Sequence, residues 1–235
     1  MKSQITNKPL SLLWVGSSST NPQIMSYTDA MLREKGFAVE SVQADAYFSM
    51  WTKNPDAESA IVQKKNDVVI LQFSTWFLKY PPEESRKAIA DARTLAEHLC
   101  KQVRENGSEP VIFEHYVSGP ISEQQEEASA VIRDVAKQNH AKIAYCGSSF
   151  ISAFKKNKDA EESFPDLLLD DNTHAGTLGN YVMSCSLFLT LTEESPVGLS
   201  FRMQGEPDEI REETAKKLQE IAWAEHQAAI CGSNA

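Results

Sequence analysis

Short apolar runs alternate with long amphipathic segments along the whole sequence, and this alternation restricts the fold more than any other feature. Several runs are apolar throughout, which is typical of strands that are buried on both faces of a parallel sheet. Between the third and fourth runs, apolar side chains recur every three or four residues over residues 83–106 and stop before Gly107, which predicts a helix. The predicted strands are residues 11–15, 37–42, 67–71, 110–113 and 142–145.

This order of elements predicts an α/β fold for residues 1–235: a single domain built as a three-layer sandwich around a five-stranded parallel sheet. A second crossover helix is expected between the last two strands, where Ser122 and Gln125 have the spacing of a capping box. A helix is also expected from about residue 22 to residue 35. Residues 155–162 are predicted to be a charged, solvated connection.

Charge and cysteine content limit the classes of protein that this chain can belong to. The 235 residues hold 23 Lys and Arg against 33 Asp and Glu, a formal net charge of −10, which disfavours nucleic acid as a partner. No apolar stretch approaches the roughly 20 residues of a spanning helix, so no membrane partner is expected. The four cysteines form no CxxC pair and have no histidine at metal-ligand spacing, which argues against a disulfide framework and a metal site. Because no export signal is visible, we expect a cytoplasmic protein with reduced thiols.

A hydroxyl-rich turn follows the first predicted strand. In an open parallel sheet, ligands bind beyond the carboxyl ends of the strands. The sequence Gly16-Ser17-Ser18-Ser19-Thr20 lies at such an end and directly precedes a predicted helix. The N–H groups and the dipole at a helix N-terminus suit a phosphate or the oxyanion of acyl transfer. The serines can equally serve only as a helix cap.

Two other segments carry groups suited to the same chemistry. Asp171 and His174 are three residues apart, a spacing that can place a carboxylate beside an imidazole and stabilise the imidazolium. An aspartate before a helix can also act only as a cap. Gln72-Phe73-Ser74-Thr75-Trp76 follows the third strand, so its polar groups are expected across the switch point from Ser18.

Taken together and in this order, these segments resemble the SGNH hydrolase superfamily, also called GDSL esterases and lipases. Ser18 stands at the position of the nucleophile, with Ser17 where the family usually has Asp, and the final D-x-x-H block reads Asp171-Asn172-Thr173-His174. The resemblance extends through residues 179–181, 195–199 and 222–223, which are similar to a bacterial branch of largely uncharacterised members. It implies a flavodoxin-like SGNH hydrolase fold, and a triad of Ser18, Asp171 and His174.

The sequence departs from the family pattern at two blocks that bind the oxyanion. The segment after the second strand has no Gly, so the resemblance implies that a backbone donor near Asp45 replaces it. Ser74 occupies the position of the family's Asn, with Gln72 two residues before it. The implied oxyanion hole is therefore made by Ser18, Asp45 and Ser74, with shorter or altered donors that predict low turnover or an unusual substrate.

The implied function is a serine hydrolase that cleaves an acyl or acetyl ester, carried by a small molecule or a carbohydrate, without a metal or organic cofactor. Gln72, Trp76 and His115 are candidate substrate-binding residues, although His115 also fits a hydrogen-bonded structural imidazole. Two alternatives stay open. One is a catalytically impaired relative that binds ligand without turnover, and the other is a flavodoxin-like protein that binds flavin or phosphate. A homo-oligomer is compatible with the sequence.

Overall fold

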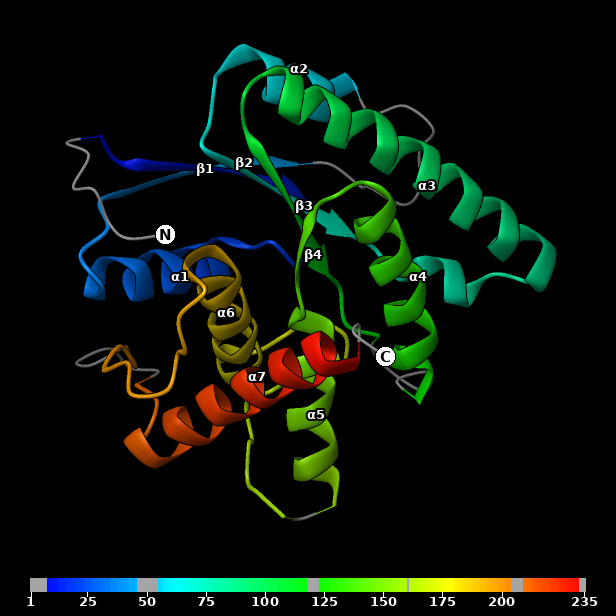
Figure 1. Ribbon diagram of the computed structural model, residues 1–235. Coiled ribbons are helices and arrows are strands. Elements are labelled where there is room, and N and C mark those ends of the chain that lie inside the picture. The colour runs from blue at the N-terminus through cyan, green and yellow to red at the C-terminus, as the bar shows by residue number, and fades with distance from the viewer. Residues whose placement is uncertain (1–7, 46–54, 118–122, 160, 204–208, 233–235) are drawn as a thin grey trace.

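A five-stranded parallel sheet forms the centre of the protein (Figure 1). The computed structural model describes residues 8–45, 55–117, 123–159, 161–203 and 209–232. The strand order is β2-β1-β3-β4-β5, and every neighbouring pair is parallel. The strands are β1 (Leu10–Gly16), β2 (Val39–Asp45), β3 (Val68–Phe73), β4 (Glu109–Glu114) and β5 (Lys142–Ala144). The predicted sheet is confirmed, and each predicted strand overlaps an observed one.

Helices cover both faces of this sheet, as the alternation of elements predicted (Figure 1). One face carries α2 (Pro55–Gln63), α3 (Pro82–Glu105) and α4 (Gln125–Gln138), and a short 3₁₀ helix, η1 (Trp76–Lys79), precedes α3. The other face carries α1 (Pro22–Glu34), α5 (Cys146–Lys158), α6 (Thr177–Thr192) and α7 (Glu212–Gly232).

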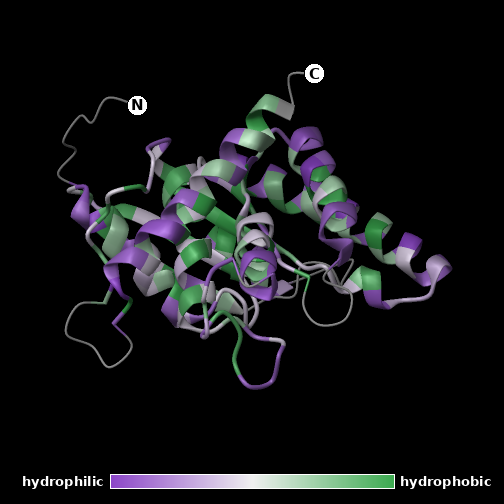
Figure 2. Ribbon diagram, turned by 90° about the horizontal axis from the view of Figure 1, so that it is seen from below, coloured by the Kyte–Doolittle hydropathy of each residue, from purple (hydrophilic) through white to green (hydrophobic). Residues whose placement is uncertain are grey.

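The pleat of β1 explains why each face has its own core. Successive side chains of a strand point to opposite faces. Leu12 and Trp14 therefore belong to the cluster under α1 and α6, whereas Leu13 and Val15 belong to the cluster under α3 and α4. In Figure 2 the hydrophilic parts of the helices lie mainly on the outside and the hydrophobic parts face inward. The three-layer α/β sandwich follows from these two clusters.

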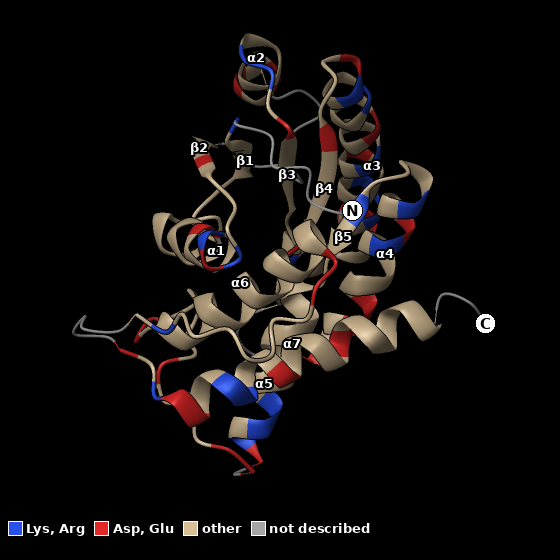
Figure 3. Cartoon of the chain, turned by 60° about the vertical axis from the view of Figure 1, so that its left-hand side comes forward, with Lys and Arg blue, Asp and Glu red and all other residues tan. Residues whose placement is uncertain are grey.

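Helix α6 is buried on all sides. Its residues from Leu178 to Thr190 are all buried, because α1, α5 and α7 pack around it. Figure 3 shows no charged residue on α6, whereas α5 carries lysines in its last turn. A helix that is hydrophobic all round belongs in a core. No helix within the described ranges is long and apolar enough to cross a membrane.

Two local predictions were wrong. Residues 155–158 are the last turn of α5 rather than a connection. Lys155, Lys156 and Lys158 lie at the C-terminal end of this helix, where the helix dipole stabilises positive charge. At the start of α4, Gln124 occupies the N-cap position without a side-chain cap. Gln125 instead accepts a hydrogen bond from the N–H of Val117 at 2.7 Å, and Ser122 lies outside the described residues.

The order of the strands also locates the switch point. The chain steps from β1 outward to β2 and then returns to β3 on the other side of β1. Helices α1 and α2, which follow β1 and β2, lie on opposite faces. The switch point therefore lies beyond the carboxyl ends of β1 and β3, where both hydroxyl-rich segments begin.

Candidate active site

The turn after β1 presents Ser18 to solvent and keeps its neighbours inside. Ser18 is exposed, whereas Ser19 and Thr20 are buried. The N–H of Thr20 donates to the carbonyl of Ser17 at 2.9 Å, which closes the turn. The cap of α1 is Asn21, whose side chain accepts from the N–H groups of the first turn. The serines are therefore not the helix cap, and the exposed one lies at the tip of the turn.

Gly16 is required where this turn leaves the strand. A Cβ atom at this position would collide with Thr20 Oγ1 and with the side chain of Gln72. Gln72 packs here because its Oε1 accepts from the N–H of Ser17 at 2.9 Å and its Nε2 donates to the Ser17 hydroxyl at 3.2 Å. Both ends of the Gln72 amide therefore support the turn that carries Ser18.

The segment before α6 forms a second tight turn, which brings Asp171 and His174 together. Oδ1 of Asp171 accepts from the N–H groups of Thr173 and His174, both at 2.9 Å. Asn172 takes a left-handed conformation with φ of 53°, which asparagine tolerates better than most residues. Oδ2 of Asp171 remains free for the imidazole and accepts from Nδ1 of His174 at 2.6 Å.

The two turns meet at a hydrogen bond between the hydroxyl of Ser18 and the imidazole of His174. Ser18 Oγ and His174 Nε2 are 3.2 Å apart, although the residues are 156 positions apart in the sequence. Because the Asp171 carboxylate accepts the proton on Nδ1, Nε2 is left as the acceptor that can take a proton from Ser18. The structure thus brings together the three residues that the sequence predicted as a triad.

The carboxylate of this arrangement is held in its charged form. The hydrogen bond from the His174 side chain, together with those from the N–H groups of His174 and Thr173, lowers the pKa of Asp171 to about 2. Asp171 and His174 stay accessible, with side-chain exposures of 48% and 44%. An ionised Asp171 can therefore orient the imidazole across the whole neutral range in a site that is open to solvent.

The other predicted oxyanion and substrate residues lie at or just after the carboxyl ends of β2 and β3. Asp45 is the last residue of β2 and pairs with Gly16 in the sheet. Ser74 is buried, and its Oγ accepts from the N–H of Trp76 at 3.3 Å, so its own proton can be donated elsewhere. Trp76 is 42% exposed, with the ammonium of Lys79 4.5 Å from its ring centre. Their roles in binding stay predictions.

His115 is buried behind the turn that carries Ser18 and is not exposed to solvent. Its Nε2 lies 2.6 Å from the hydroxyl of Ser19, and its Nδ1 contacts the carbonyl of Tyr116 and, at 3.3 Å, the hydroxyl of Thr75. Burial lowers the pKa of His115 to about 4, so the ring is neutral at pH 7. A substrate contact by His115 would require one of these bonds to break.

Sequence reasoning did not predict that Tyr116 and Asn180 also support the site. The Tyr116 hydroxyl donates to the carbonyl of Thr173 at 2.8 Å, inside the turn that carries His174. Asn180, on α6, accepts from the Asn21 side chain at 3.2 Å and donates to the carbonyl of Ala175. For each of these two residues the sequence contains one weak signal. Tyr116 follows the predicted fourth strand, and Asn180 belongs to a segment that resembles the SGNH pattern.

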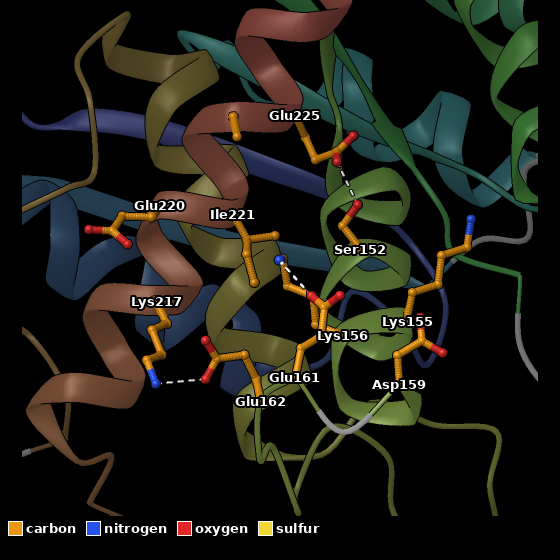
Figure 4. Close-up of a pocket in the computed structure, with 11 residues that line it drawn as sticks. Ser152, Lys155, Lys156, Asp159, Glu161, Glu162, Lys217, Glu220, Ile221 and Glu225 are labelled. Carbon is orange, nitrogen blue, oxygen red and sulfur yellow. Dashed lines mark hydrogen bonds and ion pairs between the residues drawn. The ribbon is translucent and has the colours of Figure 1, made fainter.

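Two hollows lie elsewhere on the surface. One, of about 470 Å³, lies between α5 and α7, with a Lys217–Glu162 pair at 2.6 Å and a Lys156–Glu161 pair at 3.3 Å in its lining (Figure 4). The other, of about 680 Å³, lies between α4, β5 and α7. Neither is lined by a residue of the predicted triad. The described residues contain no group of three His, Cys, Asp or Glu that is placed to hold a metal ion.

No model of a known protein family and no curated protein matches this sequence. Solved structures do match. A DUF4886 family protein from Bacteroides uniformis shares 13% identity with a TM-score of 0.65, over 95% of both chains. Axe2, an acetylxylan esterase from Geobacillus stearothermophilus, shares 14% identity with a TM-score of 0.58, over 78% of this chain and 94% of its own.

A putative SGNH hydrolase from Slackia heliotrinireducens matches over 78% of this chain and all of its own, with 15% identity and a TM-score of 0.53. The protein has the SGNH hydrolase fold. In this SGNH hydrolase fold, Ser18 follows the first strand and His174 precedes α6, in the order that the sequence blocks predicted. At such low identity the likeness extends to the fold and not to the chemistry.

Proposed function

We propose that this protein is a serine hydrolase of ester bonds, with Ser18 as nucleophile, His174 as base and Asp171 as the group that orients the base. The observation that carries the proposal is the continuous chain of hydrogen bonds from Ser18 Oγ to His174 Nε2 at 3.2 Å and from His174 Nδ1 to Asp171 Oδ2 at 2.6 Å. Nucleophile and base at this distance, with the base held by a third group, are the geometric requirement for covalent acyl transfer.

The proposed reaction has two steps. Ser18 Oγ attacks the ester carbonyl while His174 takes its proton, and the protonated imidazole then gives that proton to the leaving alcohol. The acyl group stays on Ser18 until His174 removes a proton from water and the hydroxide attacks the same carbonyl. The bond between the acyl carbon and Ser18 Oγ then breaks, His174 returns the proton to Oγ, and the acid is released. Asp171 remains ionised throughout and stabilises the imidazolium.

The oxyanion of each tetrahedral intermediate needs donors near the carboxyl ends of β1, β2 and β3. We propose the N–H of Ser18, a backbone donor at Asp45 and the hydroxyl of Ser74 for this role. The pairing of Asp45 with Gly16 supports their proximity, and the contact of Ser74 with the Trp76 N–H leaves its hydroxyl proton unused. Removing one such donor typically costs about 3 kcal/mol in the barrier.

The proposed substrate is an acyl or acetyl ester of a small molecule or carbohydrate. The likeness to acetylxylan esterases supports the class, and the exposed ring of Trp76 offers a surface on which a sugar can stack. A turnover assay with p-nitrophenyl acetate, p-nitrophenyl butyrate and an acetylated xylo-oligosaccharide tests both the reaction and the acyl length.

Two variants and one matched control decide the proposal. Ser18→Ala and His174→Ala should each lower kcat by roughly 10³-fold or more in a folded protein. His98→Ala removes another histidine that lies 3.0 Å from a carboxylate, that of Glu58, on the surface of α3, and should retain full turnover. Wild-type turnover in the Ser18 or His174 variant would refute the proposed mechanism.

A phosphate- or flavin-binding function is less well supported by the same turn. Several N–H groups that such a ligand would use already have partners. The N–H of Ser17 donates to Gln72, and the N–H of Thr20 donates to the carbonyl of Ser17. The N–H groups of Gln23 and Ile24 donate to the side chain of Asn21. An anion at this helix N-terminus would have to displace these bonds. A catalytically impaired relative is distinguished by the assay above, since it would show the same fold without turnover.

A further inference from the structure

Two adjacent buried residues, His115 and Tyr116, lie behind both turns of the proposed triad. They follow β4, and their exposed fractions are 8% and 1%. His115 contacts the turn that carries Ser18, and Tyr116 contacts the turn that carries His174. The two turns belong to segments that are distant in the sequence, so their relative position depends on contacts of this kind.

His115 binds the nucleophile turn in a defined tautomer. A carbonyl oxygen can only accept, so the contact of Nδ1 with the Tyr116 carbonyl places the proton on Nδ1. Nε2 is then an acceptor, and the hydroxyl of Ser19 donates to it at 2.6 Å. This bond fixes the side chain of the residue that directly follows Ser18.

Tyr116 binds the turn that carries His174 through its hydroxyl group. Burial raises the pKa of Tyr116 to about 12, so the phenol keeps its proton and donates it to the carbonyl of Thr173 at 2.8 Å. It therefore fixes the carbonyl of the residue directly before His174.

The pair is itself held rigidly. The rings of His115 and Tyr116 are stacked with centroids 4.7 Å apart, and Tyr116 also stacks on Phe150 of α5 at 4.2 Å. Gln125 accepts from the N–H of Val117 at 2.7 Å and donates to the carbonyl of His115 at 3.3 Å. The helices on both faces thus fix the strand end from which both contacts are made.

We propose that His115 and Tyr116 are positioning residues that hold Ser18 and His174 at reactive distance. This inference rests on the proposed function, and it gives His115 a role behind the nucleophile rather than on the substrate. Deleting either contact lets the turns shift relative to each other, and a displacement of about 1 Å between reacting groups costs on the order of 10²-fold in rate.

The first test compares two substitutions of equal chemistry. Tyr116→Phe removes the hydroxyl that binds Thr173 and keeps both ring stacks. Tyr181→Phe removes a buried hydroxyl that donates to the carbonyl of Phe201 at 2.9 Å, away from both turns. We expect Tyr116→Phe to lower kcat at least tenfold with little change in KM, and Tyr181→Phe to retain kcat. Equal kcat in the two variants would overturn the proposal.

The second test uses rescue at His115. His115→Gln offers an amide oxygen to Ser19, whereas His115→Phe fills the space without an acceptor. We expect His115→Gln to retain most of kcat and His115→Phe to lose at least tenfold. Equal losses in the two variants would show that the ring serves only as packing.

The imidazole ¹⁵N spectrum of His174 separates this inference from the function on which it rests. We expect Tyr116→Phe to shift the His174 ring signals and Tyr181→Phe to leave them unchanged. If the wild-type protein has no turnover but the shift occurs, the proposed function fails while the positioning role stands. Unshifted His174 signals in Tyr116→Phe would overturn the positioning role, whether or not the protein is active.

Discussion

Acid should destabilise this protein through His115, and the size of the effect follows from the structure. Burial lowers the pKa of His115 from 6.5 to about 4 in the folded chain, against the smaller opposing effect of its bond to the Tyr116 carbonyl and with a further contribution from the charge of Lys79. Between these values the unfolded chain binds a proton that the folded chain does not, so the free energy of unfolding falls as pH falls. Because of this shift, the free energy of unfolding falls by about 3 kcal/mol as the pH falls from about 6.5 to about 4. Above pH 6.5 His115 is neutral in both states and causes no loss of stability.

Urea unfolding of the wild type and of His115→Gln, followed by tryptophan fluorescence at several pH values, measures this difference. Gln does not titrate, so the stability advantage of the wild type over the variant should shrink by about 3 kcal/mol on acidification from pH 7 to pH 4. Buried Glu114, whose pKa burial raises, acts in the opposite direction but is present in both proteins. Parallel stability curves for the two proteins would refute a buried neutral His115.

Three further results are expected. Asp171→Asn should lower kcat by about 10³- to 10⁴-fold with a nearly unchanged melting temperature, because an amide N–H facing Nδ1 forces the imidazole into the tautomer that cannot accept from Ser18; a loss below tenfold would contradict this. Gly16→Ala should cost about 1 to 3 kcal/mol in a denaturant titration, since its Cβ overlaps Thr20 and Gln72, and an unchanged midpoint would contradict the packing at this turn. Titration with Ellman's reagent should find one rapidly reacting thiol, Cys231, in the native protein and all four thiols after denaturation. Cys100, Cys146 and Cys185 should react slowly in the native protein because they are buried and their pKa values are raised. A second fast thiol in the native state would contradict this burial.

The sheet could be predicted from the sequence because its strands are buried on both faces. Two strands contain uninterrupted apolar runs, Leu12 to Val15 and Val69 to Leu71. Few structures other than a strand buried on both faces require a short run of this kind. Helix α5 was not predicted. Its last turn carries Lys155, Lys156 and Lys158, and a charged segment resembles a solvated connection when its structural surroundings are unknown. The capping box at Gln125 was wrong because a distant group, the N–H of Val117, competes for the same side chain.

The contact between Ser18 and His174 was predictable for a different reason. It was implied by the resemblance of the Gly16–Thr20 and Asp171–His174 segments, taken together, to the SGNH pattern, whereas the spacing of Asp171 and His174 alone also fitted a helix cap. The contacts of Gln72, His115 and Tyr116 were not predictable, since each side chain could face either the substrate or the neighbouring turn. Tertiary packing decides this choice, and for Gln72 it favours the Ser17 amide.

Activation of Ser18 by His174 is the central claim, and covalent labelling tests it most directly. The purified protein is incubated with a fluorophosphonate probe, and fragmentation of the modified peptide distinguishes Ser18 from Ser17 and Ser19. The adduct should lie on Ser18 alone, disappear in His174→Ala and persist in His98→Ala. A folded protein without an adduct, or an adduct on any other residue, would contradict the assignment of Ser18 as the nucleophile.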